Sequence, residues 1–374
     1  MAMITVLGGG RVGGAIARDL AVNHKVMLVD KDSQPLDRLR DYANLSVLQA
    51  NLSDPDALSR AVHDAQWVVG AVPGYMGFAV FKQVIELGKN CVDISFFPED
   101  GLSLDSLAKE RGVCAVFDMG VAPGLDHLLL GYHRARGPVK SFRCLVGGLP
   151  EQRTWPFYYK APFSPVDVLQ EYTRPARMRQ KGQDVVIPAL SDTEYVEFEG
   201  IGTLEAFASD GLRSLLHTMP DVESLCEKTL RYPGHVEVIK MLRAAGFFSE
   251  EVIPVGDCRV SPMQITEQVL AQQWGFAESE ADFTVMRVEI ERAVGGVVRY
   301  TMADRFDHEN KILSMARTTG FSCTAALNAM IDGIFQGAGV FAPEHLGAQD
   351  DIYHYMMAYL NNREVYLHRH DADT

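Results

Sequence analysis

Residues 4–13 of this chain read ITVLGGGRVG, a short apolar run that passes directly into the spaced glycines Gly8, Gly10 and Gly13. The run is typical of a buried strand, and the residues after it have the spacing of an amphipathic helix. In such a unit the first glycine permits a tight turn, the second lets a pyrophosphate approach the backbone, and the third lets helix and strand pack closely. N–H groups at the start of the helix then bind the phosphates. The stretch therefore predicts a dinucleotide-binding unit.

A carboxylate at the end of the second strand-like run indicates which dinucleotide binds. Asp30 lies 20 residues after Gly10, where an acidic side chain accepts hydrogen bonds from the adenosine ribose and repels a 2′-phosphate. The neighbouring Lys31 would tolerate that phosphate, so the argument rests on Asp30. We expect NAD as the cofactor. The residues predicted to contact it are Gly8, Gly10, Arg11, Val12, Gly13, Asp30, Lys31, Val72, Pro73, Gly120 and Pro123.

The first 120 residues alternate strand-like and helical stretches. Helical spacing covers residues 11–20 and about 75–87, and Ser53-Asp54-Pro55 is a helix start in which we favour Asp54 as the cap over a contact to adenine. Short apolar strands separated by helices of about ten residues pair in parallel through right-handed crossovers. An α/β fold with a doubly wound, Rossmann-type parallel sheet is therefore expected. Its strands are predicted at residues 4–7, 25–29, 46–49, 67–71, 91–94 and 113–117.

The pattern changes beyond this domain, where a second α+β domain with a mixed or antiparallel sheet is expected. Residues 283–291 and 297–300 flank Gly295-Gly296 and predict an antiparallel hairpin. Residues 316–335 return to helical spacing, and the polar residues 367–374 are expected to be frayed. The expected parts are a dinucleotide-binding domain at 1–120, a substrate and dimerisation domain at 121–315, and a helical return onto the first domain at 316–374.

Composition narrows the function classes. The 374 residues carry a formal net charge of −14, and such an acidic surface repels phosphate backbones, so no nucleic-acid partner is expected. No run of about 18 apolar residues occurs and no leader-like segment precedes the first strand, so no membrane partner is expected. The six cysteines are at least 23 positions apart, which is typical of reduced thiols in a cytoplasmic protein and offers no paired metal ligands. We expect no metal site, and no hydrolase motif such as H-E-x-x-H occurs.

Two further segments are more distinctive than the glycine loop. Residues 117–127 read FDMGVAPGLDH, and residues 228–235 read KTLRYPGH. With shorter matches elsewhere, they make the chain resemble the saccharopine dehydrogenase family from the glycine loop to about residue 345, most closely its L-lysine 6-dehydrogenase branch. Saccharopine reductases of the family tend to carry Asp where this chain has Ala122, and they favour NADP. The shorter matches are GGLP at residues 147–150, FSP at 163–165 and GTLEAF at 202–207.

The resemblance implies an enzyme of amino-acid metabolism. It implies oxidative deamination of a side-chain amine, or the reverse reductive amination, with hydride passing to the nicotinamide and the imine reacting with water. It also implies a homodimer and a small-molecule amino-acid substrate. Residues 208–211 read ASDG where lysine dehydrogenases often show TSGG, so Ser209 belongs to a predicted substrate loop that differs from theirs.

Arg231 is the best candidate for binding a substrate carboxylate, because its fork of donors matches that group. A structural ion pair is the alternative. Tyr232 beside it is a second candidate, with simple packing as its alternative. Lys160 and Ser209 complete the predicted substrate-binding set, although Lys160 also fits an ordinary surface position.

Three residues are candidates for proton transfer. Asp93 lies near the end of the fifth strand and Asp118 follows the sixth, where strand ends face a crevice. Either carboxylate could bind an ammonium group or act as a base, and a structural hydrogen bond is the alternative for both. His235 titrates near neutrality and could move a proton, with a structural histidine as the alternative.

Two other functions stay open at this point. An opine- or carboxypolyamine-forming reductase would use the same cofactor on an amine and a carbonyl acid. The glycine loop followed by Val29-Asp30-Lys31-Asp32 also looks like the NAD-binding regulatory domains of potassium transporters, which bind the nucleotide without catalysis. The large second domain favours an enzyme.

Overall fold

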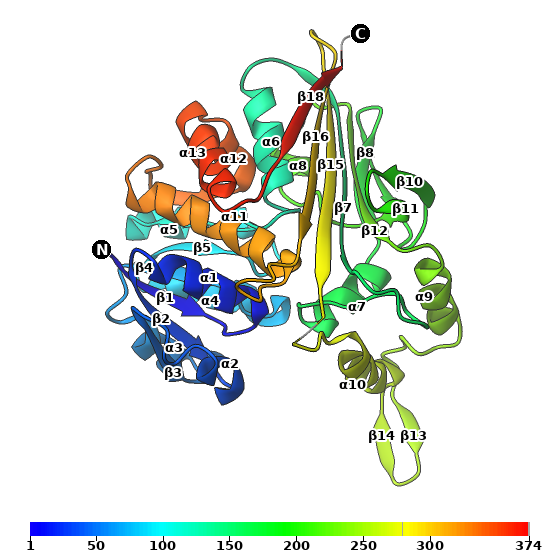
Figure 1. Ribbon diagram of the computed structural model, residues 1–374, viewed down its shortest axis with the longest axis horizontal. Coiled ribbons are helices and arrows are strands. Elements are labelled where there is room, and N and C mark those ends of the chain that lie inside the picture. The colour runs from blue at the N-terminus through cyan, green and yellow to red at the C-terminus, as the bar shows by residue number, and fades with distance from the viewer. Residues whose placement is uncertain (279, 373–374) are drawn as a thin grey trace.

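The computed structural model describes residues 1–278 and 280–372, which fold into two halves (Figure 1). The first half is a seven-stranded parallel sheet made of β1 (Met3–Leu7), β2 (Lys25–Asp30), β3 (Leu45–Gln49), β4 (Trp67–Gly70), β5 (Asn90–Asp93), β6 (Cys114–Val116) and β17 (Gly339–Phe341). The strands lie in the order β17-β6-β5-β4-β1-β2-β3. Strand order reverses between β1 and β4, which confirms the expected doubly wound fold.

Helices cover both faces of this sheet because its strands are apolar on both sides. On β1, Val6 belongs to the core beneath α1, whereas Leu7 belongs to the core beneath α3 and α4. Asp54 caps α3 as predicted, since its Oδ1 accepts a hydrogen bond from the N–H of Asp56 at 3.0 Å. The helices are α1 (Arg11–Ala21), α2 (Ser33–Asp37), α3 (Pro55–Val62), α4 (Gly74–Glu86) and α5 (Asp105–Arg111), with the short 3-10 helix η1 (Gly101–Leu104).

The second half is a nine-stranded mixed sheet, as expected. Its strands are β7 (Val139–Pro150), β8 (Ala176–Gln180), β9 (Gln183–Ile187), β10 (Glu194–Phe198), β11 (Gly202–Ala208), β12 (Ser224–Arg231), β15 (Asp282–Arg292), β16 (Val297–Arg305) and β18 (His368–Ala372). The main path is β10-β11-β12-β7-β15-β16-β18, with β8 joined to β12 and to β9. Among the described strands of this second sheet, only β12 and β7 pair in parallel. The hairpin β15–β16 confirms its prediction, and Gly295 and Gly296 take φ values of 94° and 70° in its turn.

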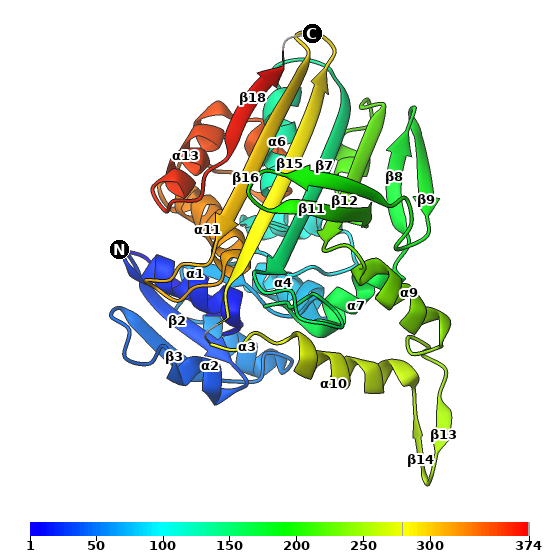
Figure 2. The same cartoon turned by 45° about the vertical axis from the view of Figure 1, so that its right-hand side comes forward.

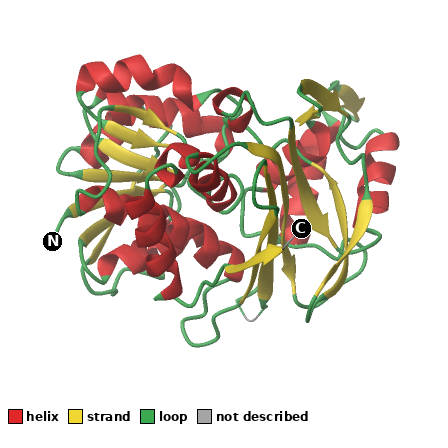
Figure 3. Ribbon diagram, turned by 90° about the horizontal axis from the view of Figure 1, so that it is seen from above, coloured by secondary structure: helices red, strands yellow, loops and turns green. Residues whose placement is uncertain are grey.

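The remaining elements lie outside the two sheets, which are side by side in Figure 3. They are α6 (Leu125–Arg134), α7 (Pro165–Thr173), α8 (Leu215–Thr218), α9 (His235–Ala244), α10 (Pro262–Trp274), α11 (Ser314–Ile331), α12 (Pro343–Gly347), α13 (Asp350–Asn361), and the strands β13 (Ile253–Val255) and β14 (Cys258–Val260). The small hairpin β13–β14 projects beyond α10 at one end of the molecule (Figure 2). Among the described helices, none is both long and apolar enough to cross a membrane.

The C-terminal segment returns to both halves. Helix α11 packs against α1, and β17 extends the parallel sheet, whereas β18 pairs with β16 of the second sheet. Tyr300 lies opposite Arg369 in that pairing. The prediction of a frayed tail is therefore wrong for residues 368–372, because backbone hydrogen bonds hold an edge strand and polar side chains do not prevent them. The last two residues of that prediction, 373–374, lie outside the described part of the chain.

Candidate functional site

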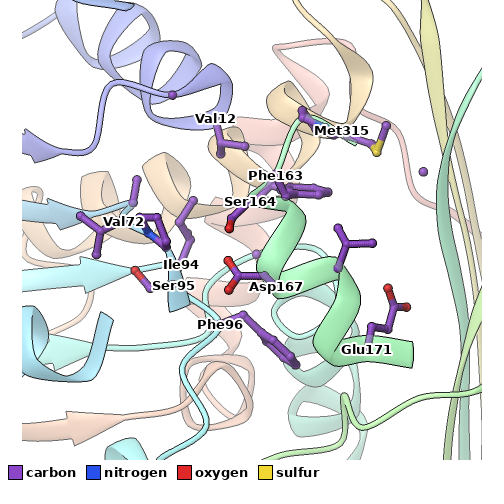
Figure 4. Close-up of a pocket in the computed structure, with 18 of the residues that line it drawn as sticks. Val12, Val72, Ile94, Ser95, Phe96, Phe163, Ser164, Asp167, Glu171 and Met315 are labelled. Carbon is purple, nitrogen blue, oxygen red and sulfur yellow. The ribbon is translucent and has the colours of Figure 1, made fainter. Parts of the chain in front are cut away.

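A cavity of about 920 Å³ lies between the two halves and is seen in close-up in Figure 4. One wall is formed by the carboxyl ends of β1, β2, β4 and β5 and by the loop that follows β6. The opposite wall is formed by α7, by β7 and β12, by the loop after β11 and by the start of α11. Open parallel sheets bind their ligands at such strand ends. The cavity is thus placed to hold a cofactor on one side and a second ligand on the other.

The glycine loop has the shape needed to hold a pyrophosphate. Gly8 takes a φ of 107°, and a Cβ there would lie 2.3 Å from the carbonyl oxygen of Ala71. A Cβ on Gly13 would lie 1.9 Å from the carbonyl oxygen of Gly8, whereas the space beside Gly10 is open. Gly10 precedes α1, and no described side chain caps that helix, so its first N–H groups are left for a ligand. The loop therefore fits a dinucleotide.

Asp30 is fixed at one edge of the cavity. Its Oδ2 accepts a hydrogen bond from the N–H of Gly9 at 2.6 Å, and its Oδ1 accepts one from the N–H of Asp32 at 2.9 Å. Two backbone groups thus hold the carboxylate beside the glycine loop, with Lys31 next to it. Every residue predicted to contact NAD lines this one cavity.

Arg231 lies on β12 in the opposite wall, and its side chain is buried. Its Nη2 donates to Glu171 Oε2 at 2.8 Å, its Nε donates to the hydroxyl of Tyr172 at 3.1 Å, and its Nη1 donates to the carbonyl of Leu230 at 2.9 Å. The ring of Tyr159 lies 4.2 Å from the guanidinium carbon. Three of the five N–H groups are engaged within the described chain, which leaves donors for a ligand carboxylate. Arg231 therefore forms a structural ion pair with Glu171 and also lines the cavity.

His235 lies behind Arg231 and outside the cavity lining. Its Nδ1 donates to the carbonyl of Phe157 at 2.7 Å, and its Nε2 accepts from the hydroxyl of Tyr172 at 3.0 Å. A carbonyl can only accept, so this pairing fixes the neutral tautomer. Burial, reinforced by the charge of Arg231, lowers the pKa of His235 to about 3. The imidazole thus contacts Tyr172, which in turn contacts Arg231, whereas His235 itself does not reach the cavity lining.

The two predicted aspartates occupy different environments. Asp93 is buried behind the cavity wall, where its Oδ1 accepts from the N–H of Ser95 at 2.6 Å and burial raises its pKa to about 7. It is outside the lining, and its carboxyl packs against Gly70. Asp118 does line the cavity and forms a short, buried ion pair with Arg213. Burial raises the pKa of Asp118, and Arg213 opposes that rise.

The other predicted substrate residues divide in the same way. Ser209 lines the cavity and accepts a hydrogen bond from the hydroxyl of Thr229 at 3.0 Å. Tyr232 turns away and donates to the carbonyl of Pro150 at 3.0 Å. Lys160 binds the carboxylate of Glu280 at 2.5 Å and also lies outside the lining, so its position is that of a structural ion pair.

The sequence analysis did not predict six charged side chains of the cavity lining, which are Asp32, Asp167, Glu171, Arg174, Asp210 and Glu227. Two sequence signals could have identified three of them. Asp167 and Glu171 are four residues apart and thus share one face of α7, and Glu227 shares a strand face with Arg231. Burial raises the pKa of Asp167 to about 6, and burial together with a neighbouring carboxyl raises the pKa of Glu227 well above its ordinary range.

The buried state of His235 predicts a pH-dependent stability. Its pKa is 6.5 in the unfolded reference and about 3 in the folded chain, so the unfolded chain binds more protons between these values. The stabilisation is therefore complete above about pH 6.5 and is lost as the pH falls toward 3. In urea unfolding, the stability advantage of the wild type over His235→Gln should be largest near neutral pH and shrink by up to about 1.4 kcal/mol per pH unit below that. Tyr172→Phe, which keeps the buried imidazole, should retain the trend; a constant difference between wild type and His235→Gln would contradict a neutral, buried His235.

Two family models together match nearly the whole chain. The model for the saccharopine dehydrogenase C-terminal domain matches residues 120–365, and the model for the saccharopine dehydrogenase NADP binding domain matches residues 4–116. Saccharopine dehydrogenase (NADP(+), L-glutamate-forming) of Schizosaccharomyces pombe is 28% identical over 219 residues, which are 55% of this chain and 49% of that protein. Alpha-aminoadipic semialdehyde synthase of Arabidopsis thaliana is 25% identical over 224 residues, 56% of this chain and 21% of that protein. The matched region thus spans about half of the first relative and about a fifth of the second.

Solved structures share this fold over the full length of the chain. Apo saccharopine dehydrogenase (L-Glu forming) from Saccharomyces cerevisiae superposes with a TM-score of 0.78 at 20% identity and covers 99% of both chains. Homospermidine synthase from Legionella pneumophila, in complex with NAD, superposes with a TM-score of 0.64 at 12% identity and covers 100% of this chain and 92% of that one. With both domain models matched in order, the chain belongs to the saccharopine dehydrogenase family.

Proposed function

We propose that this chain is an NAD-dependent dehydrogenase that oxidises the side-chain amine of an amino acid, in the manner of an L-lysine 6-dehydrogenase. One observation carries the proposal: a single cavity joins the glycine loop and Asp30 to the buried Arg231 and a set of carboxyls on the opposite wall. When bound, the nicotinamide supplies the acceptor for hydride from the carbon that bears nitrogen. The chain's own part is to hold that carbon beside the ring, to bind both ends of the substrate and to move its protons.

The charges of the second wall support a substrate with a carboxylate at one end and a cationic nitrogen at the other. Arg231 retains N–H donors for the carboxylate. Asp167 and Glu227 line the same space, and each has a buried oxygen without a hydrogen-bond partner in the described chain. A substrate without a cationic or donor group would leave these oxygens unpaired, which costs about 1–3 kcal/mol for each buried group.

We propose NAD rather than NADP, although the matching domain model and the Schizosaccharomyces relative carry NADP in their names. The carboxylate of Asp30 is held by the N–H groups of Gly9 and Asp32, so it cannot turn away from a 2′-phosphate. Asp32 brings a second negative charge to the same edge of the cavity. Repulsion between these carboxylates and a phosphate supports the choice.

We also propose a homodimer in the cytoplasm, with residues 1–120, 121–315 and 316–374 as functional parts. The second-domain sheet supports the dimer, because its edge strands β9 and β10 expose the large side chains of Val186 and Tyr195. The six cysteines are free thiols, which suits a reducing compartment. A monomeric mass in light scattering would contradict the dimer.

The proposed reaction predicts NADH formation from NAD and L-lysine. Arg231→Lys should raise the KM for the amino acid about 10- to 100-fold, because a single ammonium cannot replace the fork of donors, while the affinity for NAD stays the same. The measurement is NADH absorbance with L-lysine, saccharopine and related diamino acids. Arg299→Lys is the control, since Arg299 pairs with Glu289 on the exposed face of the second sheet and should leave KM unchanged.

The outcomes separate the competing functions. Activity that requires an amine together with a carbonyl acid would replace the proposal with a carboxypolyamine- or opine-type reductase. NAD binding without turnover of any substrate in the panel would favour a nucleotide sensor.

The proposed preference for NAD predicts that a single substitution at Asp30 shifts the preference toward NADP. Asp30→Ser removes the charge that opposes the 2′-phosphate, so the ratio of NADP to NAD affinity should rise by about tenfold or more, which corresponds to about 1.4 kcal/mol. Asp32→Ser is the matched control, because it removes an equal charge from the adjacent position and should shift the ratio far less. Fluorescence titration with both nucleotides measures this, and equal shifts in the two variants would contradict a specific role for Asp30.

A further inference from the structure

The carboxyls of the cavity wall differ in what neutralises them. Asp118 pairs with Arg213, and Glu171 pairs with Arg231 at 2.8 Å. Asp167 forms no ion pair within the described chain, and its Oδ1 is buried without a hydrogen-bond partner. Because a buried polar atom costs free energy until it is paired, an atom of this kind at a cavity wall is a place where a ligand supplies the missing partner.

The other oxygen of Asp167 is anchored on the cofactor half. Asp167 Oδ2 accepts a hydrogen bond at 3.2 Å from the N–H of Gly74, the first residue of α4. A Cβ on Gly74 would lie 2.3 Å from the carbonyl oxygen of Phe96 and 3.0 Å from Asp167 Oδ1, so glycine is needed for this approach. The carboxyl is therefore held on one oxygen and left open on the other.

Asp167 stands where the two parts of the cavity meet. Figure 4 shows its carboxyl on the side of α7 that faces Ser95 and Val72, while Glu171 lies further along the helix. Asp30 at the end of β2 marks the adenosine end of a bound dinucleotide, so the nicotinamide end lies toward β4 and β5. A substrate nitrogen beside the nicotinamide would therefore face Asp167.

We propose that Asp167 is the base that deprotonates the substrate ammonium group before the neighbouring carbon is oxidised. This inference rests on the proposed function. In the step, one N–H bond of the ammonium breaks, its electron pair stays on nitrogen, and the proton forms an O–H bond with Oδ1 of Asp167. The neutral amine then has the lone pair that stabilises the loss of hydride from its carbon. Asp167 becomes an uncharged carboxylic acid whose Oδ2 stays bonded to Gly74.

The surroundings of Asp167 suit a base that works near neutral pH. Burial raises the pKa of Asp167 to about 6, and the N–H of Gly74 and the charge of Arg174 oppose the rise. The group is thus ionised at neutral pH and still basic enough to take a proton. The titratable side chains that line the cavity around it are Arg174 after α7, Glu171 on α7, Tyr75 on α4 and Asp118, which pairs with Arg213.

Glu227, the other carboxyl of the wall with an unpaired oxygen, is less open to a ligand than Asp167. A Cβ on Gly211 would lie 1.6 Å from Glu227 Oε2, so the carboxyl packs directly against that backbone. Burial and the negative charge of Asp126 raise its pKa well above the ordinary range. The raised pKa and the close packing against Gly211 make Glu227 the less accessible of the two carboxyls, which leaves Asp167 as the base.

The substitution Asp167→Asn separates the role of this side chain as a base from its role as hydrogen-bond acceptor for Gly74. In Asp167→Asn the amide oxygen can still accept from the N–H of Gly74, but the group cannot take a proton. Asp167→Ala removes both functions. Glu237→Gln is the matched control, because Glu237 is also an acid in the first turn of a helix, α9, but its side chain is exposed outside the cavity.

The experiment measures kcat and KM for L-lysine from about pH 5 to about pH 9, together with NAD affinity and thermal unfolding. We expect Asp167→Asn to lower kcat about 100-fold or more with KM changed only a few-fold, and to abolish the loss of activity that the wild type shows below about pH 6. NAD affinity and unfolding temperature should match the wild type, and Asp167→Ala should add a loss of stability. Near-wild-type kcat with an unchanged pH profile in Asp167→Asn would overturn the role of Asp167 and leave the proposed function standing.

A binding measurement separates the two proposals if the wild type turns over no amine. Calorimetric titration of the NAD-loaded protein with L-lysine should then give tighter binding near pH 8 than near pH 5, and Asp167→Asn should lose this difference. That result would reject the proposed reaction but support Asp167 as the group that meets the ammonium. Equal affinity at both pH values, or no binding, would overturn both proposals.

Discussion

The relative position of the two halves depends on how the start of α11 is held by the second sheet. The buried carboxylate of Asp282, on β15, accepts hydrogen bonds from the N–H groups of Ser314 at 2.6 Å and Met315 at 2.9 Å. The hydroxyl of Ser314 donates to Asp304 at 2.6 Å on the neighbouring strand β16. A carboxylate at a helix N-terminus is stabilised by the free N–H groups and by the helix dipole. Because α11 then packs on α1, this junction ties the second sheet to the cofactor half that forms the other wall of the cavity (Figure 1).

The cofactor wall could be predicted from the sequence because its determinants are local. The glycine loop needs only a strand before it and a helix after it, and both patterns lie within residues 4–21. Once the strands are known to be parallel, their carboxyl ends must share one edge, so Val72, Pro73 and Gly120 follow from topology. Strand β18 could not be predicted in this way, because its residues are polar and lack an apolar alternation, while backbone pairing with β16 holds them in the sheet.

The substrate wall could be predicted only in part, because its residues depend on partners distant in sequence. Lys160 was predicted to bind substrate, but it pairs with Glu280, which lies 120 positions away in the sequence. His235 likewise binds the carbonyl of Phe157, which lies 78 positions away. Asp167 and Glu171 were not predicted as site residues, because acids four residues apart on a short helix are typical of a solvated face. Only the packing of α7 across the cavity turns that face inward (Figure 4).

The buried charges of the second wall bear on whether the chain catalyses a reaction or only senses a nucleotide. Keeping Arg231 and Glu171 away from water carries a desolvation cost that their ion pair offsets only in part, and the unpaired oxygens of Asp167 and Glu227 add to it. Binding a dinucleotide requires none of these groups, because the glycine loop and Asp30 already hold it. A fold that retains such a costly arrangement gains from it when a charged ligand enters beside the cofactor. The energetic imbalance of the apo cavity therefore favours an enzyme with a zwitterionic substrate over a regulatory NAD-binding domain.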